Sequence, residues 1–147
     1  MRFLMLMATV FVCGVAMAQT APPIKMGLWE KTITTTGMES MPSTITDKSC
    51  VTPAGYQRMV ANITRQRPNC TTQISKTAKG YNVSGTCTVN GSALTVSGST
   101  TFPDSEHILV ESHTTVVKNG QKSQIEMHSN SHWLGANCGN VKPDEDQ

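Results

Sequence analysis

The sequence is poor in several features that would point to common functions. Aromatic residues make up 5% of the 147 residues, and the 12 basic residues nearly balance the 10 acidic ones. Because proteins that bind nucleic acid usually carry a strong basic excess, this balance argues against that function. After residue 18, no apolar run approaches the roughly 20 residues that span a bilayer, so we expect no transmembrane segment.

Motifs of common catalytic sites are also missing. The chain has no Gly-x-Ser-x-Gly elbow, no Gly-rich phosphate loop before a helix and no His-Glu-x-x-His pair. Its cysteines lack the Cys-x-x-Cys or Cys-x-x-His spacing of structural zinc sites. We therefore expect a protein that is not an enzyme and has no cofactor, apart from a candidate metal site considered below.

The first eighteen residues have the pattern of a signal peptide. Arg2 provides a short positive start, residues 3–15 are almost continuously apolar, and Ala16-Met17-Ala18 forms a cleavage site before Gln19. This pattern predicts an exported protein, periplasmic or secreted. The expected parts are a signal peptide over 1–18, a lead-in over 19–26, one β domain over 27–141, and an acidic, disordered tail over 142–147.

An even number of cysteines, four, follows the apolar segment. In an exported chain this implies two disulfide bonds formed in an oxidising compartment. The spacing alone allows three pairings of Cys50, Cys70, Cys87 and Cys138.

From residue 22 onward, short runs rich in Thr, Val and Ile alternate with turn residues, a pattern typical of all-β proteins. Thr52-Pro53 has the form of an N-cap followed by proline at the first helical position, which predicts a short helix over 53–62. We expect an antiparallel meander of about seven or eight strands, curved into a partial or closed barrel. The basic stretch with Arg58, Arg65 and Arg67 is interpreted as solvated surface. The expected strands lie at about 27–36, 43–50, 70–77, 81–89, 92–102, 106–118 and 121–132.

Asn-Gly turn signals determine the expected register of the hairpins. Asn90-Gly91 is typical of a two-residue type I′ turn and places Cys87 opposite Leu94. A loop around 77–80 then brings Cys70 opposite Cys87. This register favours two disulfide bonds, Cys70–Cys87 and Cys50–Cys138.

The same register gathers apolar side chains on one face of the sheet. A three-residue loop after Phe102 aligns Val110 with Gly98 and keeps this face continuous. A barrel of about eight strands has room for one small ligand, so the face is a candidate cavity lining. The expected lining residues are Trp29, Ile74, Val83, Leu94, Val96, Ile108 and Val110.

The opposite face is expected to carry the histidines. The Asn119-Gly120 turn pairs His113 with Glu126 and Glu111 with His128. Imidazole and carboxylate together suit zinc, copper or nickel, so these four residues are candidate metal ligands. The alternative is an ordinary solvated sheet face with cross-strand charge pairs.

Four short motifs carry a resemblance to a known family. They are Gly27-Leu28-Trp29-Glu30, Cys50-Val51-Thr52-Pro53, the central Cys70 and Cys87, and the closing segment 133–143. In this combination the chain resembles the small exported bacterial proteins grouped as domain of unknown function 3617. The resemblance implies a periplasmic or secreted protein of a Gram-negative bacterium, and it supplies no activity and no catalytic residues.

Two functional hypotheses follow. The first is non-enzymatic binding of a small apolar ligand or a metal. The second is a periplasmic protein-interaction module, such as an enzyme inhibitor or an envelope-stress factor, that acts through a loop or a sheet edge. A cavity of roughly a few hundred Å³ favours the first, whereas a filled interior with an exposed apolar patch or an unpaired edge strand favours the second.

Overall fold

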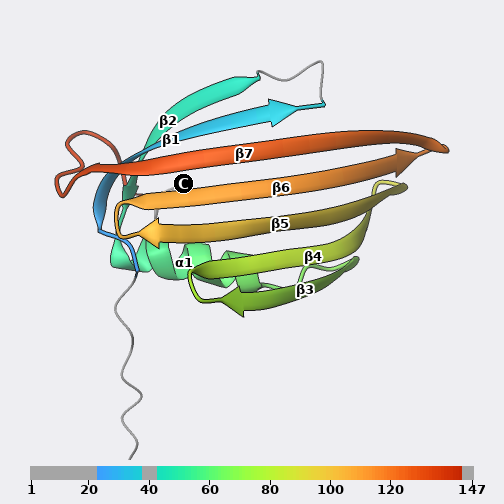
Figure 1. Ribbon diagram of the computed structural model, residues 1–147, viewed down its shortest axis with the longest axis horizontal. Coiled ribbons are helices and arrows are strands. Elements are labelled where there is room, and N and C mark those ends of the chain that lie inside the picture. Colours follow the sequence, from blue (N-terminus) through green and yellow to red (C-terminus); the bar gives the residue numbers. More distant parts are fainter. Residues whose placement is uncertain (1–22, 38–42, 144–147) are drawn as a thin grey trace, which may run out of the picture.

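The computed structural model describes residues 23–37 and 43–143, which form one curved antiparallel sheet and one helix (Figure 1). The expected signal peptide and the last residues of the acidic tail lie outside the described residues. The elements are β1 (Gly27–Thr36), β2 (Thr44–Val51), α1 (Pro53–Thr64), β3 (Cys70–Thr77), β4 (Gly80–Val89), β5 (Ser92–Asp104), β6 (His107–Lys118) and β7 (Gln121–Gly135).

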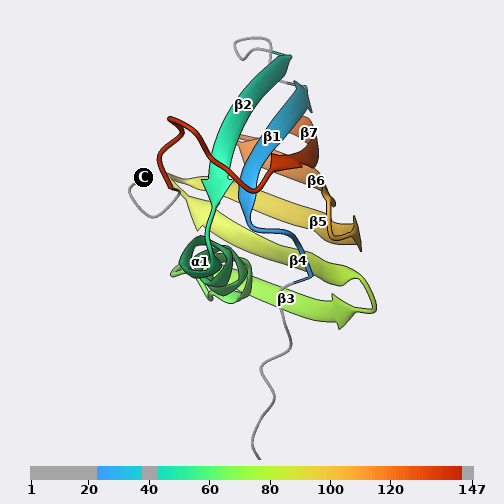
Figure 2. The same cartoon turned by 90° about the vertical axis from the view of Figure 1, so that its left-hand side faces the viewer.

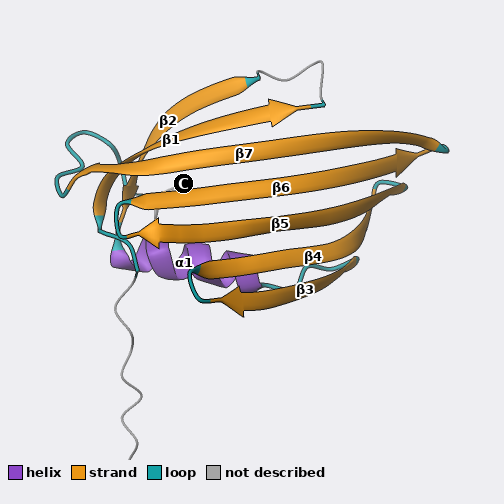
Figure 3. Ribbon diagram, in the orientation of Figure 1, coloured by secondary structure: helices purple, strands orange, loops and turns teal. Residues whose placement is uncertain are grey.

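The seven strands follow the order β2-β1-β7-β6-β5-β4-β3 in one sheet. The mainly antiparallel fold is confirmed, but the closed version of the barrel is wrong, because β2 and β3 lie at opposite ends of the sheet. The chain between these two strands forms α1, which lies against the concave face near β3 and β4 (Figures 2 and 3). A helix cannot continue the hydrogen-bonded ladder of a sheet, so the gap between the two edges stays open.

Helix α1 begins where the cap signal predicts. The Thr52 side chain accepts a hydrogen bond of 3.1 Å from the backbone N–H of Gly55, and Pro53 follows in the first turn. The helix ends at Thr64, two residues later than expected, and Arg65 is already extended. No helix in the described part of the chain combines the length and the apolar character needed to cross a membrane.

The two Asn-Gly turns have the left-handed backbone that type I′ turns require. Asn90 and Gly91 have φ angles of 50° and 76°, and Asn119-Gly120 has nearly the same pair of angles. Consequently Cys87 pairs with Leu94, and His113 pairs with Glu126, as the register predicted.

The predicted alignment of Val110 with Gly98 is wrong, because Val110 lies opposite Thr100. An irregularity between Thr101 and Asp104 is responsible, and it contains Pro103, which has no N–H to donate to the ladder. The shift of two residues leaves the same side chains on the same face, because side chains alternate with a period of two.

The core lies at one end of the concave face. Trp29 is 1% exposed and packs in one cluster with Ile24, Phe102 and Ile108, and the α1 residue Tyr56 packs against it. The indole N–H of Trp29 donates to the carbonyl of Lys25, and that of Trp133 donates to the carbonyl of Met26. The expected lead-in segment therefore contributes to the packed structure, because it supplies Ile24 and its carbonyl groups accept hydrogen bonds from both indoles.

Two disulfide bonds join the pairs that the register favoured. Cys50–Cys138 links β2 to the C-terminal segment over a sequence separation of 88, and Cys70–Cys87 links β3 to β4 over 17. Next to the first bond, Pro143 forms an isolated bridge with Cys50, so the start of the expected tail lies against β2.

Candidate functional site

A cavity of about 760 Å³ lies between α1 and the concave face of β3, β4 and β5. One wall is formed by α1 and the segment that follows it, and the other wall is formed by the strands. Its lining comprises Gly55, Arg58, Met59, Asn62, Ile63, Arg65, Arg67, Cys70, Thr72, Ile74, Val83, Gly85, Cys87, Val96 and Thr100.

Part of the predicted lining is found in this cavity. Ile74, Val83 and Val96 come together from three adjacent strands and line it, as the hairpin register implies. The other four predicted residues lie on the same face but not in this lining. Trp29 and Ile108 belong to the buried core, Val110 packs against that core, and Leu94 is half-buried on β5.

Glycine residues in β4 and β5 help to keep the cavity from being filled by side chains of these strands. Gly85 lies in the middle of β4, where a Cβ atom would stand 2.4 Å from the carbonyl oxygen of Thr71 on β3. Gly98 on β5 has a similar close approach of 2.6 Å to the carbonyl oxygen of Glu111. Glycine at such points permits neighbouring strands to bend closely together and leaves space above the sheet.

Helix α1 covers one side of the cavity but does not enclose it completely. Tyr56 and Met59 pack against the Trp29 core, which anchors α1 at that end. Met59 also lines the cavity, so it marks the boundary between the packed region and the hollow one. Burial, and to a smaller extent the neighbouring Tyr81, raises the pKa of Tyr56 above its ordinary value of 10.0.

Three arginines line the cavity, although the sequence interpretation assigned them to solvated surface. Arg58 comes from the second turn of α1, and Arg65 and Arg67 come from the segment that joins α1 to β3. All three are exposed residues, which places them where the cavity meets solvent.

A charge pattern in the sequence would have indicated this basic site. No Asp or Glu occurs between Asp47 and Asp104, a stretch that includes α1, β3 and β4 and most of β5. Overall net charge conceals this segregation, because the acidic residues outside the stretch balance it. The basic residues inside the stretch are Lys48, Arg58, Arg65, Arg67, Lys76 and Lys79.

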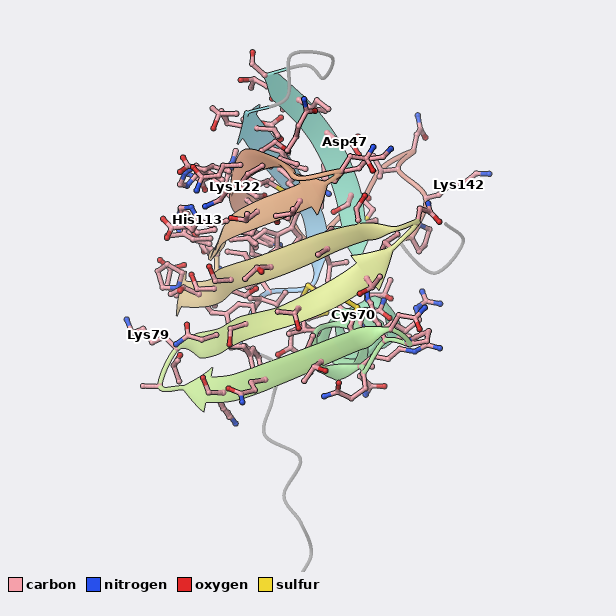
Figure 4. All side chains as sticks on the ribbon, turned by 90° about the vertical axis from the view of Figure 1, so that its right-hand side faces the viewer. Asp47, Cys70, Lys79, His113, Lys122 and Lys142 are labelled. Atoms are coloured by element: carbon pink, nitrogen blue, oxygen red, sulfur yellow. A yellow bond between two sulfur atoms is a disulfide. The ribbon has the colours of Figure 1, made fainter. Side chains whose placement is uncertain are left out.

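The four candidate metal ligands lie on the convex face, away from the cavity. In Figure 4, His113 projects from one side of the sheet and Cys70 lies on the side of α1. The His113 Nδ1 atom is 3.5 Å from Glu126 Oε1, and His128 Nδ1 is 3.8 Å from Glu111 Oε1. All four side chains are more than half exposed, which makes each pair a solvated cross-strand contact.

Within residues 23–37 and 43–143, no group of three or more ligand-type side chains is arranged to hold a metal ion. The convex-face pairs therefore offer two ligands each rather than a shared set. Metal binding there stays a prediction, and a zinc or copper titration of the protein with His113 and His128 replaced by Ala tests it.

Comparison with known proteins identifies a family but no characterised relative. A family model described as a protein of unknown function (DUF3617) matches residues 24–138. The match begins at the buried Ile24 and ends at the disulfide-bonded Cys138, so it includes the core and the cavity. No curated protein and no solved structure gives a significant match.

Proposed function

The chain belongs to the DUF3617 family, and we propose that it is an exported protein that binds one small apolar ligand without catalysing a reaction. The observation that carries this proposal is the cavity of about 760 Å³ beneath α1. Ligand sites in proteins typically occupy roughly 300–1,000 Å³ and combine a mainly apolar lining with a few polar groups. Transfer of each ligand methylene from water into such a site contributes about 0.8 kcal/mol.

A disulfide bond and packing against the core hold the walls of the cavity in place. The Cys70–Cys87 bond fixes β3 against β4, and Tyr56 anchors the helix on the core. A ligand therefore enters a space that is already formed, which lowers the ordering cost of binding. Export is supported by the N-terminal sequence pattern and by two disulfide bonds, which persist in oxidising compartments.

Native mass spectrometry of the exported protein tests this proposal directly. We expect extra mass that is lost on denaturation, or uptake of an added apolar fluorophore by the ligand-free protein. Val83→Trp fills the cavity from β4 and should abolish uptake. The matched control is Ser84→Trp, because the neighbouring side chain projects from the opposite face of the same strand and should leave uptake unchanged. Equal uptake by both variants, or none by the unmodified protein, would contradict the proposal.

An interaction module is the second candidate, and the open sheet favours it. Each of the edge strands β2 and β3 has a sheet neighbour on one side only. Exposed edges can accept an added strand from another chain. In the same mass spectra, a bound protein instead of a small molecule would support this candidate.

A further inference from the structure

We propose that the cavity ligand is a single-chain amphiphile with an anionic head group, a carboxylate or a phosphate, whose head is bound by Arg58, Arg65 and Arg67. This inference rests on the proposed function, because it needs the cavity to hold a ligand. It adds the chemical class of that ligand and the end of the cavity at which its head lies.

The lining divides into an apolar part and a basic part. The strands contribute Ile74, Val83 and Val96 together with the Cys70–Cys87 disulfide, and the helix contributes Met59 and Ile63. The three arginines come from α1 and from the segment that follows it. An elongated ligand with one apolar and one charged end matches this division.

The sign of the head group follows from the charges at the site. None of the described lining residues is acidic. Arg65 and Arg67 form no ion pair with any carboxylate in the described part of the chain. An anion beside Arg65 and Arg67 therefore gains Coulomb attraction without displacing an ion-pair partner in the described part of the chain.

Guanidinium groups are suited to the two head groups named. The planar fork of an arginine donates two parallel hydrogen bonds to a carboxylate or a phosphate. Neutral polar groups, Asn62, Thr72 and Thr100, complete the polar lining.

Compensation of the helix dipole does not account for the basic cluster. A cation near the C-terminus of a helix is favourable, and Arg65 stands at that end of α1. Arg58, however, lies in the second turn, and Arg67 lies beyond the helix. The dipole effect falls off within one turn, so it explains at most one of the three.

The test compares three ligands of equal chain length by isothermal titration. Dodecanoate and dodecyl phosphate carry the two anionic heads, and 1-dodecanol is the neutral reference. The variant is Arg65→Gln with Arg67→Gln. The matched control is Lys118→Gln with Lys122→Gln, which removes the same charge from two exposed residues next to the β6–β7 turn. Circular dichroism and melting temperature establish that both variants are folded.

We expect the anionic ligands to bind more tightly than dodecanol, with the arginine variant weakening them on the order of tenfold or more. Dodecanol binding and the lysine control should remain unchanged. The stronger of the two anions identifies the head group as carboxylate or phosphate. Recovery of part of the affinity with Arg65→Lys and Arg67→Lys would further support a charge-based contact.

Other outcomes overturn the inference in distinguishable ways. Equal binding of all three ligands to all variants would leave an apolar binding site but refute the anionic head. Equal weakening of the anions by the lysine control would show a general charge effect and also refute it. Binding of no ligand to any protein would refute the proposed function together with the inference.

Discussion

The two ends of the concave face differ in how they are filled, although the same sheet forms both. At one end, Trp29, Phe102 and Ile108 pack with Ile24 into a buried cluster. At the other end, glycine, threonine and valine residues of the strands face α1 across a cavity of about 760 Å³. The packed end holds the fold together, and the hollow end is available for a ligand.

The comparison shows that alternation alone does not make a core. Both ends have the period-two pattern that places alternate residues on the concave face, as β4 shows at the hollow end and β6 at the packed end. Side-chain size and the anchoring of α1 make the difference, because the helix rests on the aromatic end and extends over the end with small residues. Perturbations at the packed end should therefore change stability, and those at the hollow end should mainly change binding.

Removal of the disulfides should give the largest effects. Replacing Cys50 and Cys138 by Ala should lower the free energy of unfolding by about 4.5 kcal/mol, and the same change at Cys70 and Cys87 by about 3 kcal/mol. The longer sequence separation, 88 against 17, accounts for the difference, since a longer loop constrains the unfolded chain more. Urea denaturation of both double variants measures this, and an equal loss would contradict the loop-length argument.

Truncation of one large side chain at the packed end should cost nearly as much. Trp29→Ala should lower the free energy of unfolding by about 3–5 kcal/mol, because it leaves a void among buried neighbours. Val96→Ala, at the hollow end, should cost about 1 kcal/mol or less, since its side chain already borders open space. Similar losses for the two variants in urea denaturation would remove the distinction between the ends.

Addition of a methyl group to the hollow end tests the close strand approach. Gly85→Ala should cost about 1–3 kcal/mol, because its Cβ atom would stand 2.4 Å from the carbonyl oxygen of Thr71. Gly135→Ala is the matched control, since no heavy atom lies within 4 Å of the added Cβ and its φ is not positive. If Gly85→Ala does not change the free energy of unfolding, β3 and β4 can move apart at this point without loss of stability.

The smallest effect should be a loss of stability in acid that comes from Asp104, which lies at the packed end. Hydrogen bonds from the backbone N–H of Glu106, and then from His107, lower the pKa of Asp104 below its ordinary value of 3.8. The unfolded state therefore binds the proton more readily, so the stabilisation by Asp104 is present above about pH 4 and is lost as the pH falls through the lower folded pKa.

Asp104→Asn should lose this contribution at neutral pH and converge with the unmodified protein in acid. Urea midpoints measured from pH 7 down to pH 2 check the convergence. If the difference in urea midpoint between the variant and the unmodified protein stays constant with pH, the Asp104 charge has no part in the effect. Between Lys48 and Pro103, which includes most of the cavity lining, there is no carboxylate to add a similar acid response.

Local sequence signals predicted the strands, turns and disulfides well because each depends on near neighbours. The Asn-Gly turns set the hairpin register, and that register brought Cys70 opposite Cys87. The alignment after Phe102 failed because an irregularity at Pro103 lengthens β5, which residue propensities alone do not specify. The lining was predicted only in part, since period-two alternation assigns a face but not the position of α1 above it.

By itself, the sequence determined the antiparallel hairpins, the capped helix, the two faces of the sheet and the cysteine pairs. These follow from backbone conformation and side-chain alternation, which act over a few residues or across one turn. Only the tertiary structure decided that the sheet stays open and that α1 covers the β3–β5 end of its concave face. It also brought Arg58, Arg65 and Arg67 to one cavity. Those outcomes depend on how distant elements pack against Trp29 and its neighbours, and such packing is a property of the whole chain.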